Sequence, residues 1–196
     1  MSMLTIWADG DPSTPLLRTT DTGVIGQELA AVGIAYSHHD VRPGTTPDST
    51  QEDVLSVYRD LVDDLCAQHG YTLVDVVQLH LDENSTEDLR ATAAGARQRF
   101  LNEHTHDEEE IRFFSHGSGV FYLHIGDRVL GMLCTEGDLL SVPALTTHWF
   151  DMGTLPDFTA IRFFRTDDGW VGTFTGSDIA SGFPTFDELS RDAIHA

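Results

Sequence analysis

The spacing of apolar residues predicts two amphipathic helices in the first half of the chain. The first begins at Thr50, whose side chain can form a capping box with Asp53, and ends near Gly70, where the apolar pattern stops. The second is expected within residues 85–101. The residues expected to face inward are Val54, Tyr58, Leu61 and Leu65 in the first helix and Leu89, Ala93, Ala96 and Phe100 in the second.

Short apolar runs predict strands, most of them after residue 101. Before that point, residues 71–81 are rich in Val and Leu, and residues 29–36 could form a strand that leads to His38 and His39. The later strands are expected at 120–125, 129–134 and 158–164, with turns at 117–119, 126–127 and 137–138 and a loop at 152–158. Strands at this spacing are typical of a β-barrel or jelly roll. We therefore expect a mainly β protein with a few helices.

A length of 196 residues suits one domain, and neither a linker nor a repeat divides it. We expect residues 1–100 to pack as strands and helices on a barrel core formed by residues 101–176. Residues 177–196 are expected to form a tail, with a short helix capped by Thr185 through Asp187 and Glu188.

The composition excludes several functions. The formal net charge is −21, from 32 acidic and 11 basic residues, and every basic residue is Arg. Such a surface repels phosphate backbones and anionic lipid headgroups, so we expect no nucleic-acid or membrane partner. The first ten residues lack a targeting pattern, which favours a cytoplasmic location. Cys66 and Cys134 form no CxxC pair and are expected to be structural.

Three histidines and one glutamate point to chemistry. His104, His106 and Glu110 lie close together in the sequence, and His148 follows a Gly-Asp turn and a Pro. Imidazole nitrogens and a carboxylate oxygen suit Fe(II), Ni(II), Mn(II), Co(II) or Zn(II). The set predicts an octahedral metal site in which two adjacent positions stay open for substrate.

The spacing of these residues also predicts local structure. His104 and His106 share a face if they lie in a strand. A strand that continued straight on would put Glu110 about 13 Å from His106, so the chain must turn between them. Residues 107–109 supply that turn, and each of these acids can bind metal on chemistry alone. The phase of the next strand favours Glu110, which shares its face with Arg112.

The sequence Ile-Arg-Phe-Phe occurs twice, at residues 111–114 and 161–164. An Arg among apolar neighbours in a strand is costly to bury unless it meets an anion. We therefore expect Arg112 and Arg162 to face an anionic ligand in the barrel. The alternative is a snorkelling side chain or a structural pair with an acidic residue, and it weighs more heavily for Arg162.

Two segments resemble the two motifs of the cupin superfamily. The first runs from His104 through Glu110 to Gly117, and the second from Gly137 through Pro143 to His148. The departures from the general pattern are Gln98, Leu145 and Met152, and Leu145 stands where the second motif has an inner glycine. Within the superfamily, residues 71–176 resemble the acireductone dioxygenase family. The segments that carry this resemblance are 100–106, 109–114, 137–139, 142–144, 148–153, 162–164 and 169–171.

The resemblance implies a double-stranded β-helix barrel and a dioxygenase of methionine salvage that holds one Fe(II) or Ni(II) per chain. The substrate would be the enediol 1,2-dihydroxy-3-keto-5-methylthiopentene, cleaved with O2. With Fe(II) the products would be formate and 2-oxo-4-methylthiobutanoate. With Ni(II) they would be carbon monoxide, formate and 3-methylthiopropanoate.

The resemblance also assigns roles to residues. The implied metal ligands are His104, His106, Glu110 and His148. Arg112 would help to form and hold the substrate dianion. Glu103 is linked to metal incorporation and Glu109 to a conformational relay, although both could equally be solvated acids beside a turn. Phe100 and Phe150 could pack against the methylthio tail, and a role as core aromatics explains them equally well.

Two other functions stay open at this point. Another metal-dependent cupin enzyme would keep the four ligands without needing the paired arginines, and a non-catalytic ligand-binding cupin would turn over no enediol. The affinity order of divalent metals favours Ni(II) over Fe(II) at a fixed site, so cellular supply is expected to decide which metal is loaded. The expected partners are the small-molecule enediol and O2, and the chain is expected to be a monomer.

Overall fold

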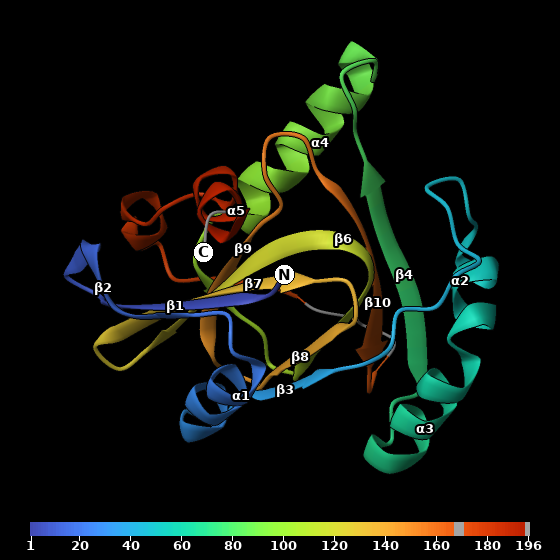
Figure 1. Ribbon diagram of the computed structural model, residues 1–196, viewed down its shortest axis with the longest axis horizontal. Helices are drawn as coiled ribbons and strands as arrows, with labels where there is room; N and C mark the ends of the chain where they lie inside the picture. The colour runs from blue at the N-terminus through green and yellow to red at the C-terminus, as the bar shows by residue number, and fades with distance from the viewer. Residues whose placement is uncertain (167–170, 195–196) are drawn as a thin grey trace.

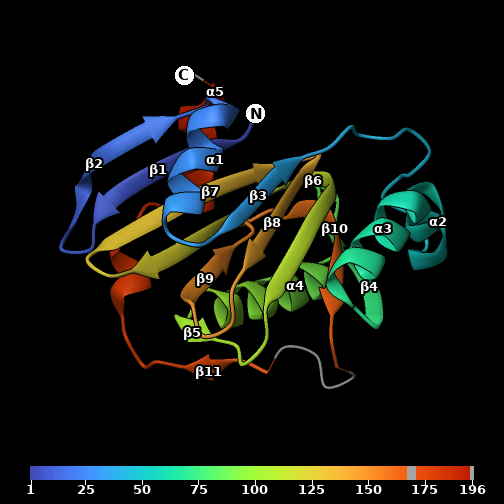
Figure 2. The ribbon, with the colours of Figure 1, turned by 90° about the horizontal axis from the view of Figure 1, so that it is seen from below.

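The computed structural model describes residues 1–166 and 171–194. In this part of the chain, eleven strands form two antiparallel sheets that share the long strand β6 (Glu110–Ile125). Figures 1 and 2 show β6 running through the middle of the molecule, with β1, β2 and β7 at one end and β4 and β10 at the other. The predicted mainly β fold with a few helices is confirmed.

Sheet A has the strand order β11-β5-β9-β6-β7-β1-β2, and sheet B has the order β3-β8-β6-β10-β4. The other strands of sheet A are β1 (Met3–Ala8), β2 (Asp11–Thr19), β5 (His104–Thr105), β7 (Arg128–Thr135), β9 (Thr147–Asp151) and β11 (Thr173–Phe174). Those of sheet B are β3 (Ala35–His38), β4 (Leu73–His80), β8 (Asp138–Val142) and β10 (Asp157–Phe164). The strands of the first 100 residues are therefore hydrogen-bonded into both sheets.

Strand β6 joins the sheets because its two halves pair with different neighbours. Residues 110–113 pair with β8, whereas residues 118–125 pair with β7. Gly117 lies between these halves at φ 68°, and a Cβ there would come within 1.8 Å of the Asp157 carbonyl oxygen. The turn predicted at residues 117–119 is wrong, since the strand bends here without reversing its direction.

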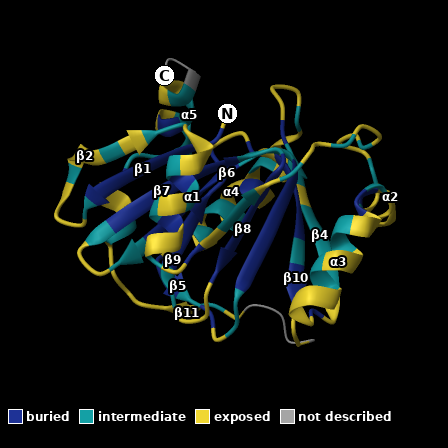
Figure 3. Ribbon diagram, turned by 60° about the horizontal axis from the view of Figure 1, so that its bottom comes forward, coloured by how far each residue is buried: buried dark blue, intermediate teal, exposed yellow. Residues whose placement is uncertain are grey.

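Apolar side chains fill the space between the sheets and cover both outer faces. Figure 3 shows the strands mostly buried and the helices exposed on their outer sides. The inner core includes Leu4, Ile6, Phe114, Phe121, Leu130, Met132, Leu140 and Phe158. Helices α2 (Gln51–Val57) and α3 (Arg59–His69) cover the outer face of sheet B, and α5 (Phe186–Ile194) packs on that of sheet A. Strands such as β7, β8 and β10 are therefore buried almost continuously, as strands of a sheet covered on both faces are.

The helices show where local signals were sufficient. The capping box between Thr50 and Asp53 is present, and Gly70 ends α3 in the left-handed conformation. The single helix expected between them is divided at Tyr58, whose hydroxyl accepts a hydrogen bond from the Arg42 backbone N–H. The Thr185 amide and hydroxyl both donate to Glu188 at the start of α5, as predicted, whereas Asp187 accepts from the Thr154 backbone N–H and not from Thr185.

Two expectations for the first 100 residues are corrected. The run 29–36 is not one strand: α1 (Thr22–Ala31) occupies its start, because the Asp21 side chain caps that helix, and only β3 follows. Helix α4 (Glu87–Phe100) is present, but Leu89 is 40% exposed and does not face inward. Among the described residues, no helix combines the length and apolarity needed to cross a bilayer.

Candidate metal centre

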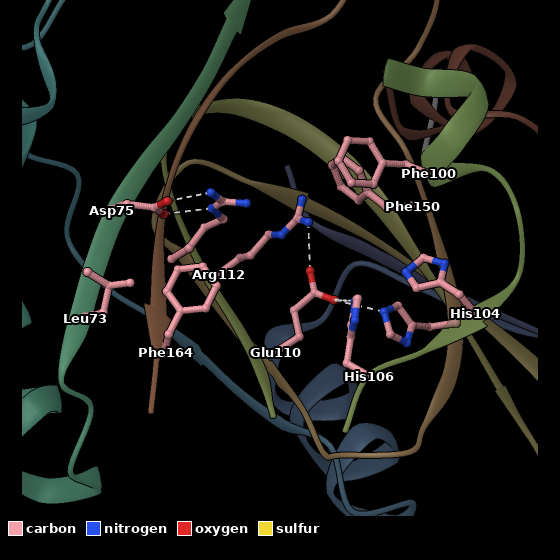
Figure 4. Close-up of a pocket in the computed structure, with 11 residues that line it drawn as sticks. Leu73, Asp75, Phe100, His104, His106, Glu110, Arg112, Phe150 and Phe164 are labelled. Atoms are coloured by element: carbon pink, nitrogen blue, oxygen red, sulfur yellow. Dashed lines mark hydrogen bonds and ion pairs between the residues drawn. The ribbon is translucent and has the colours of Figure 1, made fainter. Parts of the chain in front are cut away.

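The four residues predicted to bind metal are brought together by three strands. His104 in β5 lies directly opposite His148 in β9, and Glu110 opens β6. The chain bends between His106 and Glu110, as the spacing required. The Glu110 Oε2 atom lies 2.8 Å from His148 Nε2 and 3.2 Å from His106 Nε2. Figure 4 shows the Glu110 carboxylate between the histidine rings and Arg112.

In each of the three imidazoles, Nδ1 forms a hydrogen bond with a backbone carbonyl oxygen. His104 Nδ1 lies 2.7 Å from the Asn102 oxygen, and the equivalent distances are 3.1 Å from His106 to Val171 and 2.7 Å from His148 to Thr146. A proton on Nδ1 leaves the Nε2 lone pair of a neutral ring pointing to the centre. Lone pairs facing a carboxylate oxygen repel unless a cation lies between them. The donor set therefore fits a divalent metal ion, with every imidazole oriented from outside.

Leu145 holds the turn that carries His106. Its backbone N–H donates to the His106 carbonyl oxygen at 2.8 Å. It does so at φ 63°, the one positive φ of a non-glycine residue in the described ranges. This is the position at which the general cupin motif has a glycine, and the left-handed backbone explains why.

Glu110 is the acid that faces the histidines. It is buried, whereas Asp107 is exposed and Glu108 and Glu109 are half-buried. Burial alone would raise the pKa of the Glu110 carboxyl, but the Arg112 charge and the contacts with His106 and His148 hold that pKa well below its usual value. The centre therefore carries a fixed negative charge at neutral pH.

The histidines differ in how they hold protons without metal. Burial lowers the pKa of His104 to about 4. Burial acts most strongly and would lower the pKa of His106, but the hydrogen bond to Glu110, the charge of Glu110 and the hydrogen bond to Val171 together outweigh it, so the pKa is raised. A proton on His106 can thus offset the Glu110 charge in the metal-free protein.

Arg112 meets the anion that its buried position requires. Its Nη2 lies 2.8 Å from Glu110 Oε1, and the side chain is 5% exposed. The guanidinium also lies over the rings of Phe150, Phe121 and Phe100, at 4.7, 5.1 and 5.8 Å from their centroids. Burial lowers the pKa of Arg112. The ordinary pKa of an arginine is so high that the guanidinium nevertheless stays charged at neutral pH.

Arg162 has an acidic partner of its own. It lies opposite Arg112 on one side and opposite Asp75 on the other. Its Nε and Nη2 donate to the two Asp75 oxygens at 2.8 and 2.5 Å. The structure thus provides the acidic pair that was the alternative to substrate binding, although Arg162 also lines the cavity beside Arg112.

A cavity of about 260 Å³ opens onto the centre. Phe100 and Phe150 line it, as expected, with their ring centroids 6.4 Å apart. Its far side is formed by Leu73, Asp75 and Phe164 from β4 and β10. These three residues were not predicted, because their place in the cavity depends on the pairing of β4 with β10. The only local signal was the acid at position 75 within an apolar strand.

Glu103 is a buried acid and Glu109 is a half-buried one. Glu103 is 4% exposed and accepts hydrogen bonds from Thr175 Oγ1 at 2.6 Å and from His124 Nδ1 at 2.7 Å. Glu109 contacts the Tyr71 hydroxyl and Arg165 Nη2, each at 3.2 Å, and accepts from the Ser141 hydroxyl. Each therefore ties the ligand-bearing segment to other elements.

The chain is similar to known proteins over its whole length. The model of the ARD/ARD' family matches residues 20–172. Acireductone dioxygenase of Frankia alni is 53% identical over 197 aligned positions, which cover 100% of this chain and 94% of that protein. Acireductone dioxygenase of Saccharopolyspora erythraea is 53% identical over 189 positions, covering 96% of this chain and 98% of that protein.

A solved structure extends the similarity to the fold. It is an acireductone dioxygenase from Bacillus anthracis with a cadmium ion in its active centre. It is 26% identical to this chain, with a TM-score of 0.74, and the match covers 89% of this chain and 98% of the other. The predicted cupin fold is thereby confirmed. On these matches the chain belongs to the ARD/ARD' family and is an oxidoreductase of the dioxygenase class.

Proposed function

We propose that the protein cleaves the enediol 1,2-dihydroxy-3-keto-5-methylthiopentene with O2, as a step of methionine salvage. The observation that carries the proposal is the convergence of three outward-anchored imidazoles and one buried carboxylate on a cavity that also holds a buried arginine. The proposed products are formate and 2-oxo-4-methylthiobutanoate with Fe(II). With Ni(II) they are carbon monoxide, formate and 3-methylthiopropanoate.

The proposed metal ligands are His104, His106, Glu110 and His148, with one ion per chain. A bound Fe(II) or Ni(II) would supply Lewis acidity toward the two adjacent enediol oxygens. The backbone carbonyls hold the proton of each neutral imidazole on Nδ1, which leaves Nε2 as the ligand atom. Metal binding would still displace the proton that His106 holds toward Glu110 in the metal-free protein.

Arg112 is the proposed anion-binding group. Its guanidinium extends from the cavity wall to the Glu110 carboxylate and is enclosed by aromatic rings rather than water. Charge in this setting is weakly screened, so it favours the ionised enediol over the neutral one. Arg162 adds positive potential from the next strand while Asp75 fixes its orientation.

Phe100 and Phe150 are proposed to enclose the methylthio tail. Their rings lie at right angles, with an interplanar angle of 85°, on the cavity side that also contacts Arg112. A thioether sulfur packs favourably against ring edges. Exclusion of water from this side would also prevent water from protonating the dianion again.

Glu103 and Glu109 are proposed to act through other residues. Glu103 joins His124 of β6 to Thr175, which follows β11, and so holds β5 from both sides. That arrangement favours a role in keeping His104 ready for metal. Glu109 links β8, Tyr71 and Arg165 to the residue beside Glu110, which favours a conformational role.

The proposal is tested by loading metal-free protein with Fe(II) or Ni(II) under anaerobic conditions and then adding the enediol and air. We expect formate in both cases and carbon monoxide only with Ni(II). The control is metal-free protein kept in chelator, which should form neither product set. Absence of enediol consumption with either metal would contradict the proposal. We also propose that the protein is a monomer. Size-exclusion chromatography with light scattering tests this by measuring the molar mass in solution.

A further inference from the structure

A second group of metal-binding side chains lies on the outer face of sheet B. His80 at the end of β4 is opposite Asp157 in β10, and His116 in β6 is opposite Thr159. Residues opposite each other in an antiparallel pair share a face, as do Asp157 and Thr159 two residues apart. Three adjacent strands thus bring two imidazoles and one carboxylate to the same spot.

The facing atoms are close enough to share an ion. Asp157 Oδ1 lies 2.7 Å from His80 Nδ1 and 3.4 Å from His116 Nε2. One donor atom from each of the three residues falls within 4.8 Å of the others. Tetrahedral zinc, with bonds of about 2.0–2.2 Å, places its ligand atoms about 3.3–3.5 Å apart. The Asp157 side chain is 57% exposed, so it can move the few tenths of an ångström required.

Both imidazoles are anchored at the nitrogen that points away from Asp157. His80 Nε2 lies 3.0 Å from the buried hydroxyl of Thr159. His116 Nδ1 lies 2.9 Å from Glu136 Oε1, and the same oxygen accepts the Gly117 N–H at 3.1 Å. Metal-binding histidines almost always have such a second partner, which fixes the tautomer and the ring orientation. A histidine that only forms a hydrogen bond with a carboxylate does not need such a second partner.

The cluster is separate from the centre described above. His80 lies five residues along β4 from Asp75, about 17 Å at the rise of a strand, and on the opposite face of the sheet. It borders a groove of about 570 Å³ that Asp48 and Asp82 also line. These carboxylates favour entry of a cation, and the groove leaves room for water at a fourth position.

We propose that His80, His116 and Asp157 form a second divalent-metal site, of the zinc type, that links β4, β10 and β6. Glu136 and Thr159 position the two histidines without contacting the ion. Two imidazoles and one carboxylate with an open position suit Zn(II) among the borderline metals. The site stabilises the pairing of β4, β10 and β6 around His80, and it takes no part in the oxygen chemistry.

The test is a zinc titration of protein already loaded with Ni(II), against a chromophoric chelator. Nickel and zinc are then both measured by elemental analysis after desalting. We expect one nickel and one zinc per chain in the parent protein. The affinity for zinc should fall at least a hundredfold in His80→Ala and in His116→Ala. Glu136→Gln should weaken zinc binding by about tenfold, the effect typical of an outer partner. Zinc should raise the Tm of the parent protein and not that of His116→Ala.

The matched control is His38→Ala. His38 is also a half-exposed histidine, with Nδ1 2.8 Å from an Asp138 oxygen, but no second imidazole of the described residues completes a metal-binding group with that pair. Its zinc affinity should equal that of the parent. Circular dichroism in chelator establishes that each variant is folded before the comparison. Zinc uptake matched by nickel loss, or a second zinc unaffected by His80→Ala and His116→Ala, would overturn the proposal.

Discussion

Replacement of Arg112 by Met tests how the buried charge of Glu110 is maintained. The two groups are 2.8 Å apart, with side-chain exposures of 5% and 2%. Met keeps much of the side-chain volume among the surrounding rings but removes the positive charge. In metal-free protein, Glu110 would then lose its principal stabilising charge and its pKa would rise.

The magnitude follows from the distance and the burial. Unit charges at this separation attract by about 6 kcal/mol at an effective dielectric constant of about 20. Part of the lost attraction is offset, because Met has no charge and its burial carries no desolvation cost. We therefore expect the free energy of unfolding to fall by about 3–5 kcal/mol. With Ni(II) bound the metal compensates Glu110, so the loss should fall to about 1–2 kcal/mol, from the missing contacts with aromatic rings.

The measurement is urea unfolding at pH 7, followed by circular dichroism, with chelator and with Ni(II). Arg162→Met is the matched control, because its ion pair with Asp75 is more exposed, at 25% and 32%. That variant should lose less than Arg112→Met in chelator and be insensitive to nickel. In turnover, Arg112→Met should lose about 10²–10⁴-fold in kcat/KM, the equivalent of two charge-assisted hydrogen bonds. Equal losses for the two variants with and without metal would refute the reasoning.

Three further predictions concern single residues. His104 has a folded pKa of about 4 against an ordinary 6.5, so the unfolded chain binds more protons between these values, and metal-free protein should lose up to about 3 kcal/mol as pH falls through that window. The difference in unfolding free energy between the parent and His104→Asn, followed against pH, should show this loss, and a flat difference would contradict it. Leu145→Gly should be about 1 kcal/mol more stable than Leu145→Ala in urea unfolding, because only Gly relieves the left-handed backbone. Gly119→Ala should raise the KM for the enediol several-fold with a smaller change in kcat, because the new Cβ would lie 2.4 Å from Phe150 and force that ring to move, and steady-state kinetics tests this.

Local signals in the sequence were sufficient for several elements of the fold. The caps at Thr50 and Gly70 and the phase of Glu110 and Arg112 depend on residues a few positions apart, and each is present in the structure. The division of the predicted helix at Tyr58 was not predictable in this way. Its ring packs 4.9 Å from Phe113 of sheet B, a contact that depends on the tertiary fold.

The candidate centre was predictable as a set of residues and less so as a cavity. His104, His106 and Glu110 are constrained by their own spacing, and His148 by the motif around it. The pairing of Arg162 with Asp75 joins residues 87 positions apart, and nothing local to either one identifies the other. The second histidine cluster was missed for the same reason, since His80 and His116 meet only when β10 lies between β4 and β6.

The sharing of β6 between both sheets limits how such a protein can change during evolution. Its first half carries Glu110 and Arg112, and Leu123 in its second half sets the position of His148 across the sheet. One residue inserted or deleted within β6 would turn the side chains on one side of the change to the opposite face. Homologues should therefore vary in length in their loops and keep β6 at constant length, with adaptation to new substrates confined to point substitutions along it.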